Sequence, residues 1–262
     1  MPGDTRKVFH FYNKCHLGDN ILNLKFFYNI RRVLLENNIH IKYYYDTAYI
    51  YNTLTELQPF VDPDTLTLDD IKNNVPGSIE LWQGNSIDGI NSYKFDIFYS
   101  SLYTKISKHL NILTDSIHTT IWQDEPHLLE LYDRLDSKYK NIDILILNNR
   151  GQSGQYNNTD ELNALCMYLH TKFNIVVTQH ISDDIKCTSS DKLTIQDYGA
   201  ISTHCKYIIS VFSGTNSCLF NSSTKESVIK WFMLSVTNHS ITSVDCKFTN
   251  NISEIKTYFD SL

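Results

Sequence analysis

The sequence predicts an α/β protein with two halves of similar size, each a parallel sheet that carries helices on both faces. Apolar runs of strand length alternate with segments of helical period along the chain, which is typical of βαβ units. This alternation starts twice, at Lys7 and again at Asp143. The 262 residues are enough for two compact domains. We therefore expect a first domain over 1–121, a connecting helix over 122–140 and a second domain over 141–262.

The first half opens with the aromatic run Lys7–Tyr12, which predicts a strand, and a loop over 13–18 follows it. Apolar residues then recur every three or four positions and predict a helix over 19–37. The remaining expected elements are a strand over 39–45, a short helix over 48–57 and strands over 78–82 and 94–99.

The second half begins after a connecting helix over 122–139, where Asp124, Glu125 and Pro126 form an acidic first turn. The run Asp143–Leu147 is almost continuously apolar, as in strands buried on both faces of a parallel sheet. Thr159 is the expected N-cap of the next helix. The expected elements are a strand over 143–147, a loop over 148–158, a helix over 159–173, a strand over 174–178, a helix over 193–203, a strand over 207–211, a loop over 212–216 that leads into further helix, a strand or helix over 228–234 and a terminal helix over 252–262.

The composition excludes several classes of protein. Hydrophobic residues make up 42% and charged residues 20%, as in a globular protein with a buried core. The net charge of −6 and the lack of a strong basic run argue against a nucleic-acid partner. No run approaches the roughly 20 apolar residues that span a bilayer, and the N-terminus has no secretion signal. We therefore expect a cytoplasmic protein without a transmembrane segment.

The six cysteines form no C-x-x-C pair, and His204-Cys205 has no partner motif for zinc. Free buried thiols and the absence of a metal site are therefore the expectation.

The first candidate site lies between the first strand and the first helix, at Cys15-His16-Leu17-Gly18-Asp19-Asn20. Ligands of open α/β sheets bind beyond the carboxyl ends of strands. Gly18 permits close approach of a backbone or a ligand, and the Asp19 carboxylate is placed to take a proton from an attacking hydroxyl. The alternative is that Asp19 caps the helix, since Asp is a preferred cap. His16 is a second candidate, although a single histidine has many structural uses.

The second candidate site is the loop over 148–154, after the first strand of the second half. A polar, glycine-containing turn can offer backbone N–H groups to phosphate, and Arg150 can pair with a diphosphate in forked geometry. We include the adjacent Gly151 and Gln152 in this phosphate-binding set. A flexible surface loop is the alternative.

The third candidate site is Phe212-Ser213-Gly214-Thr215-Asn216-Ser217, between the strand 207–211 and a predicted helix. Small hydroxyl residues around a glycine at a helix N-terminus suit a phosphate group. Ser213, Gly214, Thr215 and Asn216 are therefore candidate phosphate-binding residues, and an ordinary strand-to-helix turn is the alternative.

Several known motifs are missing from the sequence. There is no G-x-G-x-x-G after the first strand, no G-x-x-x-x-G-K-[ST] and no G-x-S-x-G, which argues against a nicotinamide dehydrogenase, a P-loop kinase and a serine hydrolase. Asp62-Pro63-Asp64 is similar to the D-x-D of metal-dependent sugar transferases, but its prolines favour a turn.

The strand followed by His16-Leu17-Gly18-Asp19 and an amphipathic helix resembles the opening of two-domain GT-B glycosyltransferases, and most of all the heptosyltransferase-type group (glycosyltransferase family nine). The resemblance implies two Rossmann-like domains that face a cleft. In that group a Gly-Asp pair begins the first helix, and the Asp is the proposed catalytic base. The matching residues here are Gly18 and Asp19.

The resemblance extends to the second half, where the segments 193–201 and 205–211 are similar to the lead into the donor loop of that group. That loop usually reads Asp-Thr-Gly-x-x-His. Ser213 and Gly214 match it in kind, whereas Phe212 and Ser217 stand where the group has Asp and His. The resemblance implies a nucleotide-diphosphate sugar as donor, a glycan acceptor and no further cofactor.

The sequence thus favours a metal-independent glycosyltransferase that moves a sugar to a hydroxyl, with Asp19 as general base. Two alternatives stay open. One is a sugar-nucleotide epimerase or a pyruvyl-transferase-like enzyme on the same scaffold. The other is an inactive protein that binds a glycan or a partner, which the altered donor loop suggests.

Overall fold

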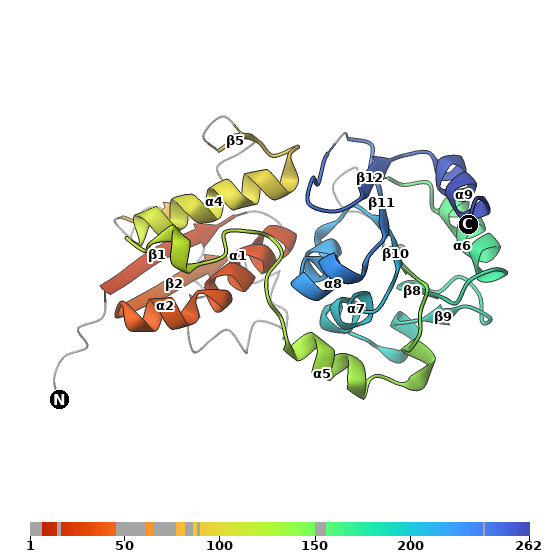
Figure 1. Ribbon diagram of the computed structural model, residues 1–262, viewed down its shortest axis with the longest axis horizontal. Helices are drawn as coiled ribbons and strands as arrows, with labels where there is room; N and C mark the ends of the chain where they lie inside the picture. The colour runs from red at the N-terminus through yellow and green to blue at the C-terminus, as the bar shows by residue number, and fades with distance from the viewer. Residues whose placement is uncertain are drawn as a thin grey trace. The chain divides into compact units, whose positions relative to one another are not determined.

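The computed structural model describes residues 7–14, 17–45, 61–64, 77–81, 86–87, 90–149, 156–237 and 239–262. The chain divides into two compact units, coloured mainly red to yellow and mainly green to blue in Figure 1. The first unit comprises Met1–Ser92 and Ile97–Gln123, and the second comprises Tyr93–Asp96 and Asp124–Leu262.

The first unit is built on a parallel sheet of strand order β3-β2-β1-β4. The chain runs from β1 through β2 to β3 on one side and then returns to place β4 on the other side of β1. The elements of this part of the chain are β1 (Lys7–Asn13), α1 (Leu17–Asn29), α2 (Arg31–Glu36), β2 (Ile39–Tyr45), β3 (Val61–Asp64), β4 (Ile79–Glu80), β5 (Ser86–Ile87), β6 (Ile90–Asn91), α4 (Phe95–His109) and the 3₁₀ helix η3 (Thr114–Ser116).

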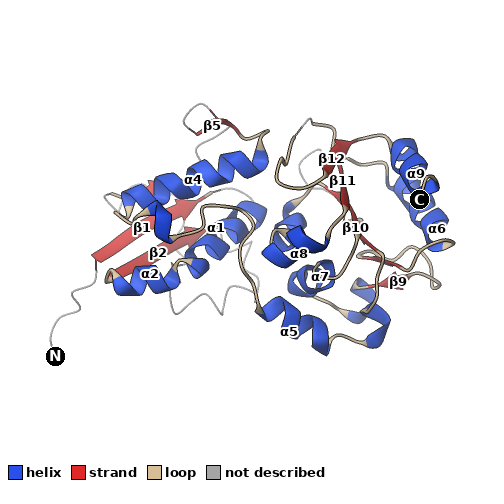
Figure 2. Cartoon of the chain, viewed as in Figure 1, coloured by secondary structure: helices blue, strands red, loops and turns tan. Residues whose placement is uncertain are grey.

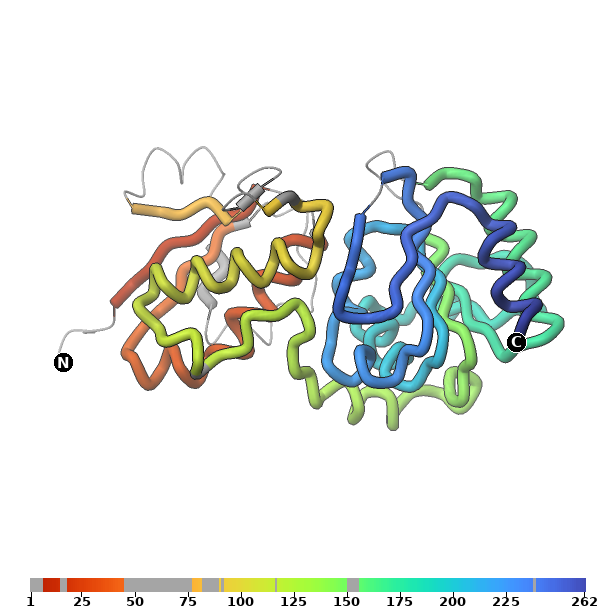
Figure 3. Tube along the Cα trace, turned by 45° about the horizontal axis from the view of Figure 1, so that its top comes forward, coloured from red at the N-terminus to blue at the C-terminus, as the bar shows by residue number. Residues whose placement is uncertain are grey.

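Helices α1 and α4 lie side by side in the first unit (Figures 1 and 3). The ring of Phe26 from α1 stacks on Tyr103 from α4, with centroids 4.2 Å apart. Phe11 of β1 contacts Phe27 of α1 on one side and His109 of α4 on the other. Aromatic rings therefore form much of the core between the sheet and these two helices, and aromatic side chains bury the most apolar area per residue.

Two expectations for the first half need correction, and a third is untested. The segment 94–99 is not a strand, because α4 covers Phe95–His109 and continues the apolar spacing Phe95, Phe98, Leu102 and Ile106. Asp62-Pro63-Asp64 is not a turn but part of β3, an edge strand where a proline costs no ladder hydrogen bond. The expected helix over 48–57 lies outside the described residues.

The expected helix over 19–37 is divided at Ile30 into α1 and α2. Two side chains bond helix carbonyls at this point: the Asn29 amide donates to the Lys25 carbonyl at 3.0 Å, and Arg31 donates to the Tyr28 carbonyl at 2.7 Å. Such local bonds compete with the main-chain ladder and distort a helix.

The second unit is built on a six-stranded parallel sheet of order β12-β11-β10-β7-β8-β9. Its elements are α5 (His127–Arg134), η4 (Ser137–Tyr139), β7 (Ile144–Leu147), α6 (Thr159–His170), β8 (Ile175–Val177), β9 (Lys186–Cys187), η5 (Ser189–Asp191), α7 (Ile195–Ser202), β10 (Tyr207–Val211), η6 (Gly214–Leu219), α8 (Ser222–Ser227), β11 (Lys230–Leu234), β12 (Cys246–Thr249) and α9 (Ile252–Asp260).

Helices cover both faces of this second sheet, with α6 and α9 on one side and α7 and α8 on the other (Figure 2). Leu165 and Leu169 of α6 and Phe259 of α9 pack with alternate residues of the central strands in one buried cluster. The four residues of β7 are all buried, as expected for a strand between two helical layers. The predicted α/β class, with parallel sheets and helices, is confirmed in both units.

Residues Tyr93–Asp96 belong to the second unit, and hydrogen bonds tie them to the segment 240–243. The Ser240 N–H donates to the Tyr93 carbonyl at 2.7 Å, and the Phe95 N–H donates to the Ser240 carbonyl at 2.9 Å. The buried Asp96 carboxylate accepts from the main-chain N–H groups of Thr242 at 2.8 Å and Ser243 at 3.0 Å.

Several boundaries in the second half differ from the expectation. In place of a helix over 122–139 there is the shorter α5, then η4. The N-cap of α6 is Asn158 rather than Thr159, and its carboxamide oxygen accepts from the Glu161 N–H at 3.3 Å. The segment that could be strand or helix over 228–234 is the strand β11.

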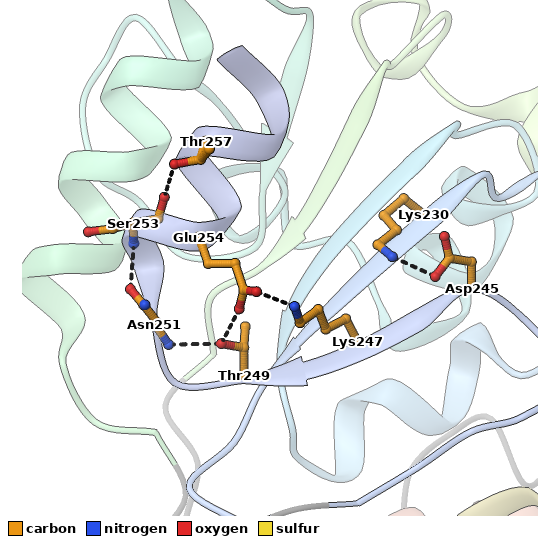
Figure 4. A network of polar contacts seen from close by, with 8 residues as sticks. All are labelled: Lys230, Asp245, Lys247, Thr249, Asn251, Ser253, Glu254 and Thr257. Carbon is orange, nitrogen blue, oxygen red and sulfur yellow. Dashed lines mark hydrogen bonds and ion pairs between the residues drawn. The ribbon is translucent and has the colours of Figure 1, made fainter. Parts of the chain in front are cut away.

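Strand β12 forms one edge of the second sheet, and charged pairs lie along it (Figure 4). Lys230 pairs with Asp245 at 2.5 Å, and Lys247 pairs with Glu254 at the start of α9. The hydrogen bond from Lys247, with a second one from Thr249, lowers the pKa of Glu254. Charges on an edge strand discourage pairing with the edge of another sheet.

Among the described residues, no helix combines the length and apolar character needed to cross a bilayer. Cys166, Cys187 and Cys205 are free and buried, as expected, whereas the free thiol Cys246 is only partly buried.

Candidate active site

In the first unit, the strand order reverses direction between β1 and β4, and α1 begins just after β1. Ligands of open α/β sheets bind at such a reversal, beyond the carboxyl ends of the strands. Asp19 lies in the first turn of α1 and is partly exposed. Because α1 begins at Leu17, Asp19 is inside the helix and does not occupy the N-cap position that was the alternative for it.

Asp19 is held by a tyrosine from α4. The Tyr99 hydroxyl donates to Asp19 Oδ1 at 2.5 Å, and the Tyr99 side chain is only 2% exposed. The Tyr99 hydroxyl therefore restrains the orientation of the Asp19 carboxyl group at the carboxyl edge of the first sheet.

Two further tyrosines donate hydrogen bonds to residues in the first two turns of α1. The Tyr43 hydroxyl of β2 donates to Asn20 Oδ1 at 2.8 Å, and the Tyr103 hydroxyl of α4 donates to the Leu22 carbonyl at 2.9 Å. Burial, with smaller contributions from Tyr43 and the Asp19 charge, raises the pKa of Tyr103 well above its usual value. Tyr103 is therefore a neutral donor at physiological pH.

A second carboxylate lies at the end of β4, beside β1. Glu80 pairs with Lys14 at 2.6 Å and accepts from the Tyr12 hydroxyl at 3.3 Å. Burial and the neighbouring Glu80 raise the pKa of Tyr12. Gly18 is buried within α1, and His16 lies outside the described residues.

In the second unit, the strand order reverses direction between β7 and β10. Ser210 is in register with Leu147, so the loops that follow β7 and β10 leave the sheet side by side. These two loops are the second and third candidate sites, and the topology brings their starting points together. Arg150, Gly151 and Gln152 lie outside the described residues.

The loop after β7 is anchored by Asn148. Its carboxamide oxygen accepts from the N–H groups of Thr178 at 3.0 Å and Gln179 at 2.8 Å, and its amide donates to the Gln179 carbonyl at 3.1 Å. The Thr178 hydroxyl also donates to Asn149 Oδ1 at 2.6 Å. This buried network joins the carboxyl ends of β7 and β8 and sets the direction in which the loop starts.

The loop after β10 presents small polar groups at the carboxyl edge. Ser213, Gly214 and Thr215 are all partly exposed, and the hydroxyls of Ser213 and Thr215 lie 2.8 Å apart. The loop leads into the six-residue 3₁₀ helix η6 rather than directly into an α-helix. The expected contribution of a helix dipole is therefore small, and the two hydroxyls and the main-chain N–H groups are what this loop offers an anion.

Asn216 occupies a different environment from its neighbours in the loop. It is 1% exposed, and its amide donates to the Ser210 hydroxyl at 2.9 Å. The indole of Trp231 donates to the same hydroxyl at 2.8 Å. The side chain of Asn216 thus ties η6 to β10 and β11 and holds the loop in place.

Gly199 permits the close packing of α7 against η6. A Cβ atom at this position would lie 2.9 Å from the Cys218 carbonyl oxygen and 3.5 Å from the side chain of Leu128. Any side chain at residue 199 would therefore push apart the two elements that support the loop after β10.

Aromatic residues surround Phe212, which follows β10. His239 lies 4.6 Å and Phe248 5.6 Å from its ring centroid. Burial lowers the pKa of His239, and a hydrogen bond to the Thr237 main chain offsets part of that effect. The imidazole Nδ1 is 2.8 Å from the Thr237 hydroxyl.

No group of three His, Cys, Asp or Glu side chains with metal-binding geometry occurs in the described part of the chain.

The three tyrosines and the Asn148–Thr178 network were not predicted from the sequence. The spacing of Tyr99 and Tyr103, four residues apart within a helical apolar pattern, was the signal that could have placed both on one helix face. Thr178 gave no such signal, because its partner is 30 residues away in the chain.

Among known proteins, similarity to this chain is found in solved structures and not in sequences. No family model matches the sequence, and no curated protein matches it. Among solved structures, it is similar to the E. coli heptosyltransferase WaaC with ADP-2-deoxy-2-fluoro heptose, with 8% identity and a TM-score of 0.61 over 97% of this chain and 99% of that one. It is also similar to a family 9 glycosyl transferase from Veillonella parvula, with 13% identity and a TM-score of 0.56 over 97% and 91% of the two chains. The chain therefore has the GT-B fold of the heptosyltransferase-like glycosyltransferases.

Proposed function

We propose that the protein is a glycosyltransferase that moves a sugar from a nucleotide-diphosphate sugar to a hydroxyl of a glycan or glycoconjugate, without a metal ion. The observation that carries this proposal is the carboxylate of Asp19, held by Tyr99 at the carboxyl edge of the first sheet in a chain with the heptosyltransferase-like fold. A carboxylate fixed in this way suits proton abstraction from an acceptor hydroxyl.

The proposed donor site is the paired loops after β7 and β10. The Ser213 and Thr215 hydroxyls and the N–H of Gly214 would bind the diphosphate, together with Arg150, Gly151 and Gln152. Two similar structures support a nucleotide-diphosphate donor, because WaaC was solved with ADP and TibC in complex with ADP-D-beta-D-heptose. Phe212 and Ser217, in place of Asp and His, give this chain a less charged donor loop, which favours neutral hydrogen-bond donors around the diphosphate.

The proposed reaction is a single displacement at the anomeric carbon, coupled to proton transfer to Asp19. Asp19 takes the proton of the acceptor hydroxyl while that oxygen forms a bond to the anomeric carbon of the donor sugar. The bond from that carbon to the diphosphate oxygen breaks, and its electron pair leaves with the nucleoside diphosphate. Hydrogen bonds from Ser213 and Thr215 would stabilise the charge that develops on this leaving group.

The test is to incubate the purified chain with a panel of nucleotide sugars, with and without simple alkyl glycosides as acceptors, in the presence of EDTA. We expect release of nucleoside diphosphate from one donor, faster with an acceptor, and a new glycoside of matching mass. An epimerised donor without release of nucleotide would instead identify a sugar-nucleotide epimerase. Binding of a donor without turnover would favour the inactive binding protein, an alternative that Phe212 and Ser217 motivate.

A further inference from the structure

Three tyrosine hydroxyls bond the first two turns of α1, and they meet chemically different acceptors. Tyr43 donates to the carboxamide of Asn20, and Tyr103 donates to the main-chain carbonyl of Leu22. Both of these acceptors are neutral at every accessible pH. Tyr99 donates to Asp19, which is a titratable carboxylate.

We propose that Tyr99 is a positioning residue for Asp19: its hydroxyl fixes the orientation of the carboxylate and keeps it ionised as the proton acceptor. The inference rests on the proposed function, since it assumes that Asp19 acts as a base. It adds a residue that the sequence does not associate with the site, because Tyr99 is 80 positions away from Asp19.

The ring of Tyr99 is fixed independently of Asp19. It is 2% exposed and contacts the ring of Phe98 at 5.5 Å and the ring of Tyr103 at 5.8 Å between centroids. A buried ring of this kind cannot turn its hydroxyl away without repacking the core. The position of the hydroxyl is therefore set by α4, and the carboxylate of Asp19 adapts to it.

A hydrogen bond to the charged form of a carboxylate favours ionisation. The Tyr99 hydroxyl therefore widens the range of pH over which Asp19 can accept a proton. It also restricts the side-chain rotamers of a partly exposed residue, so that the carboxylate spends more time in one orientation. Loss of the hydroxyl should affect the reaction through kcat and through its pH dependence.

The matched experiment compares Tyr99→Phe with Tyr103→Phe. Both variants remove one buried phenol oxygen from α4, but the first oxygen bonds a carboxylate and the second a main-chain carbonyl. The titration of Asp19 is followed by NMR on protein with ¹³C-labelled aspartate carboxyls, with the signal assigned by its absence in Asp19→Asn. This measurement needs neither donor nor acceptor.

We expect the titration midpoint of Asp19 in Tyr99→Phe to rise by about one pH unit or more, and that in Tyr103→Phe to stay within a few tenths of the wild type. With the donor found in the panel, kcat of Tyr99→Phe should fall on the order of tenfold with little change in KM, and the acidic limb of the pH–rate profile should move to higher pH.

An unchanged Asp19 midpoint in Tyr99→Phe, in a variant with a wild-type melting profile, would overturn the inference. So would equal midpoint shifts in Tyr99→Phe and Tyr103→Phe, because they would indicate a general loosening of α4. Failure of the proposed function would give a different result. Asp19→Asn would then keep full turnover, regardless of how Asp19 titrates in Tyr99→Phe.

Discussion

The two units share the strand order around their first strand but hold their candidate residues in different ways. In each, the strand order reverses beside the first strand, and the candidate residues follow the strands at that point. In the first unit, the buried Tyr99 holds a titratable carboxylate. In the second, Asn148 and Asn216 fix loops through neutral hydrogen bonds, and the groups left partly exposed are hydroxyls.

This difference separates two tasks that the same scaffold can perform. A carboxylate whose orientation and charge are controlled suits proton transfer. Loops with fixed starting directions and small neutral donors suit the binding of an anionic group, where a nearby carboxylate would repel the ligand. We therefore expect substitutions in the first unit to affect turnover, and substitutions in the second unit to affect stability and nucleotide affinity.

The largest effect is expected for Asp19→Asn. Because an amide cannot accept the proton of the acceptor hydroxyl, kcat should fall by about 10²- to 10⁴-fold. Nucleotide affinity should stay within about twofold of the wild type, because the proposed donor site lies in the second unit. Steady-state kinetics together with nucleotide titration measure the two quantities, and a parallel loss of affinity would break the proposed division of tasks.

Gly199→Ala should cause the largest loss of stability in the second unit. The added Cβ would meet the Cys218 main-chain oxygen at 2.9 Å, and a main-chain atom can move away only with η6. We expect a loss of about 1–3 kcal/mol in the free energy of unfolding, measured by urea denaturation. Gln196→Ala, at a partly buried position of the same helix, is the control and should cost much less. Wild-type stability in Gly199→Ala would contradict the close packing of α7 on η6.

Asn148→Ala should destabilise the second unit by about 1–3 kcal/mol, because the N–H groups of Thr178 and Gln179 would lose a buried acceptor. Asn149→Ala removes one bond, from the Thr178 hydroxyl, and should cost less. Hydrogen exchange of the amide protons of residues 178 and 179 is the local measurement. Equal protection in both variants would indicate that Asn148 does not anchor the loop.

The smallest effect concerns pH. Burial lowers the pKa of His239 in the folded protein, so the unfolded chain binds a proton first as the pH falls. His239 therefore costs no stability above its ordinary pKa of about 6.5, and it lowers the stability as the pH falls below that value. His239→Phe keeps a ring beside Phe212 and should lose less stability between about pH 7 and pH 5. Thr237→Val is the control for the loss of the contact between His239 and the Thr237 hydroxyl. If the stability of His239→Phe depended on pH as that of the wild type does, His239 would not be the group responsible.

Much of the fold was predictable from local patterns. The strands expected over 39–45 and 207–211 have the same bounds as β2 and β10, because each is a short apolar run between clear stop signals. The segment 94–99 was misinterpreted because its aromatic residues have high strand propensity in a short window, whereas the full stretch to His109 has a helical period. Strand β3 was missed because Pro63 argues against a strand, and only its edge position accommodates it.

The chain positions of the candidate residues were predictable, but the contacts that hold these residues were not. Gly18, Asp19, Ser213 and Gly214 stand out in the sequence because they follow predicted strands. The partners that hold Asp19 and the loop residue Asn148 come from distant elements: Tyr99 is 80 positions from Asp19, and Thr178 is 30 positions from Asn148. Contacts of this kind depend on the packing of helices on the sheet, which no local pattern encodes.

The most direct test of the central claim is a calorimetric titration of the full chain with ADP, UDP and GDP, repeated with a variant that combines Ser213→Ala and Thr215→Val. We expect one nucleotide to bind the wild type at a single site, and the variant to bind it at least about tenfold more weakly with an unchanged melting temperature. Binding of none of the three to the wild type, or equal affinity in the variant, would contradict the donor site in the second unit and with it the assignment as a glycosyltransferase.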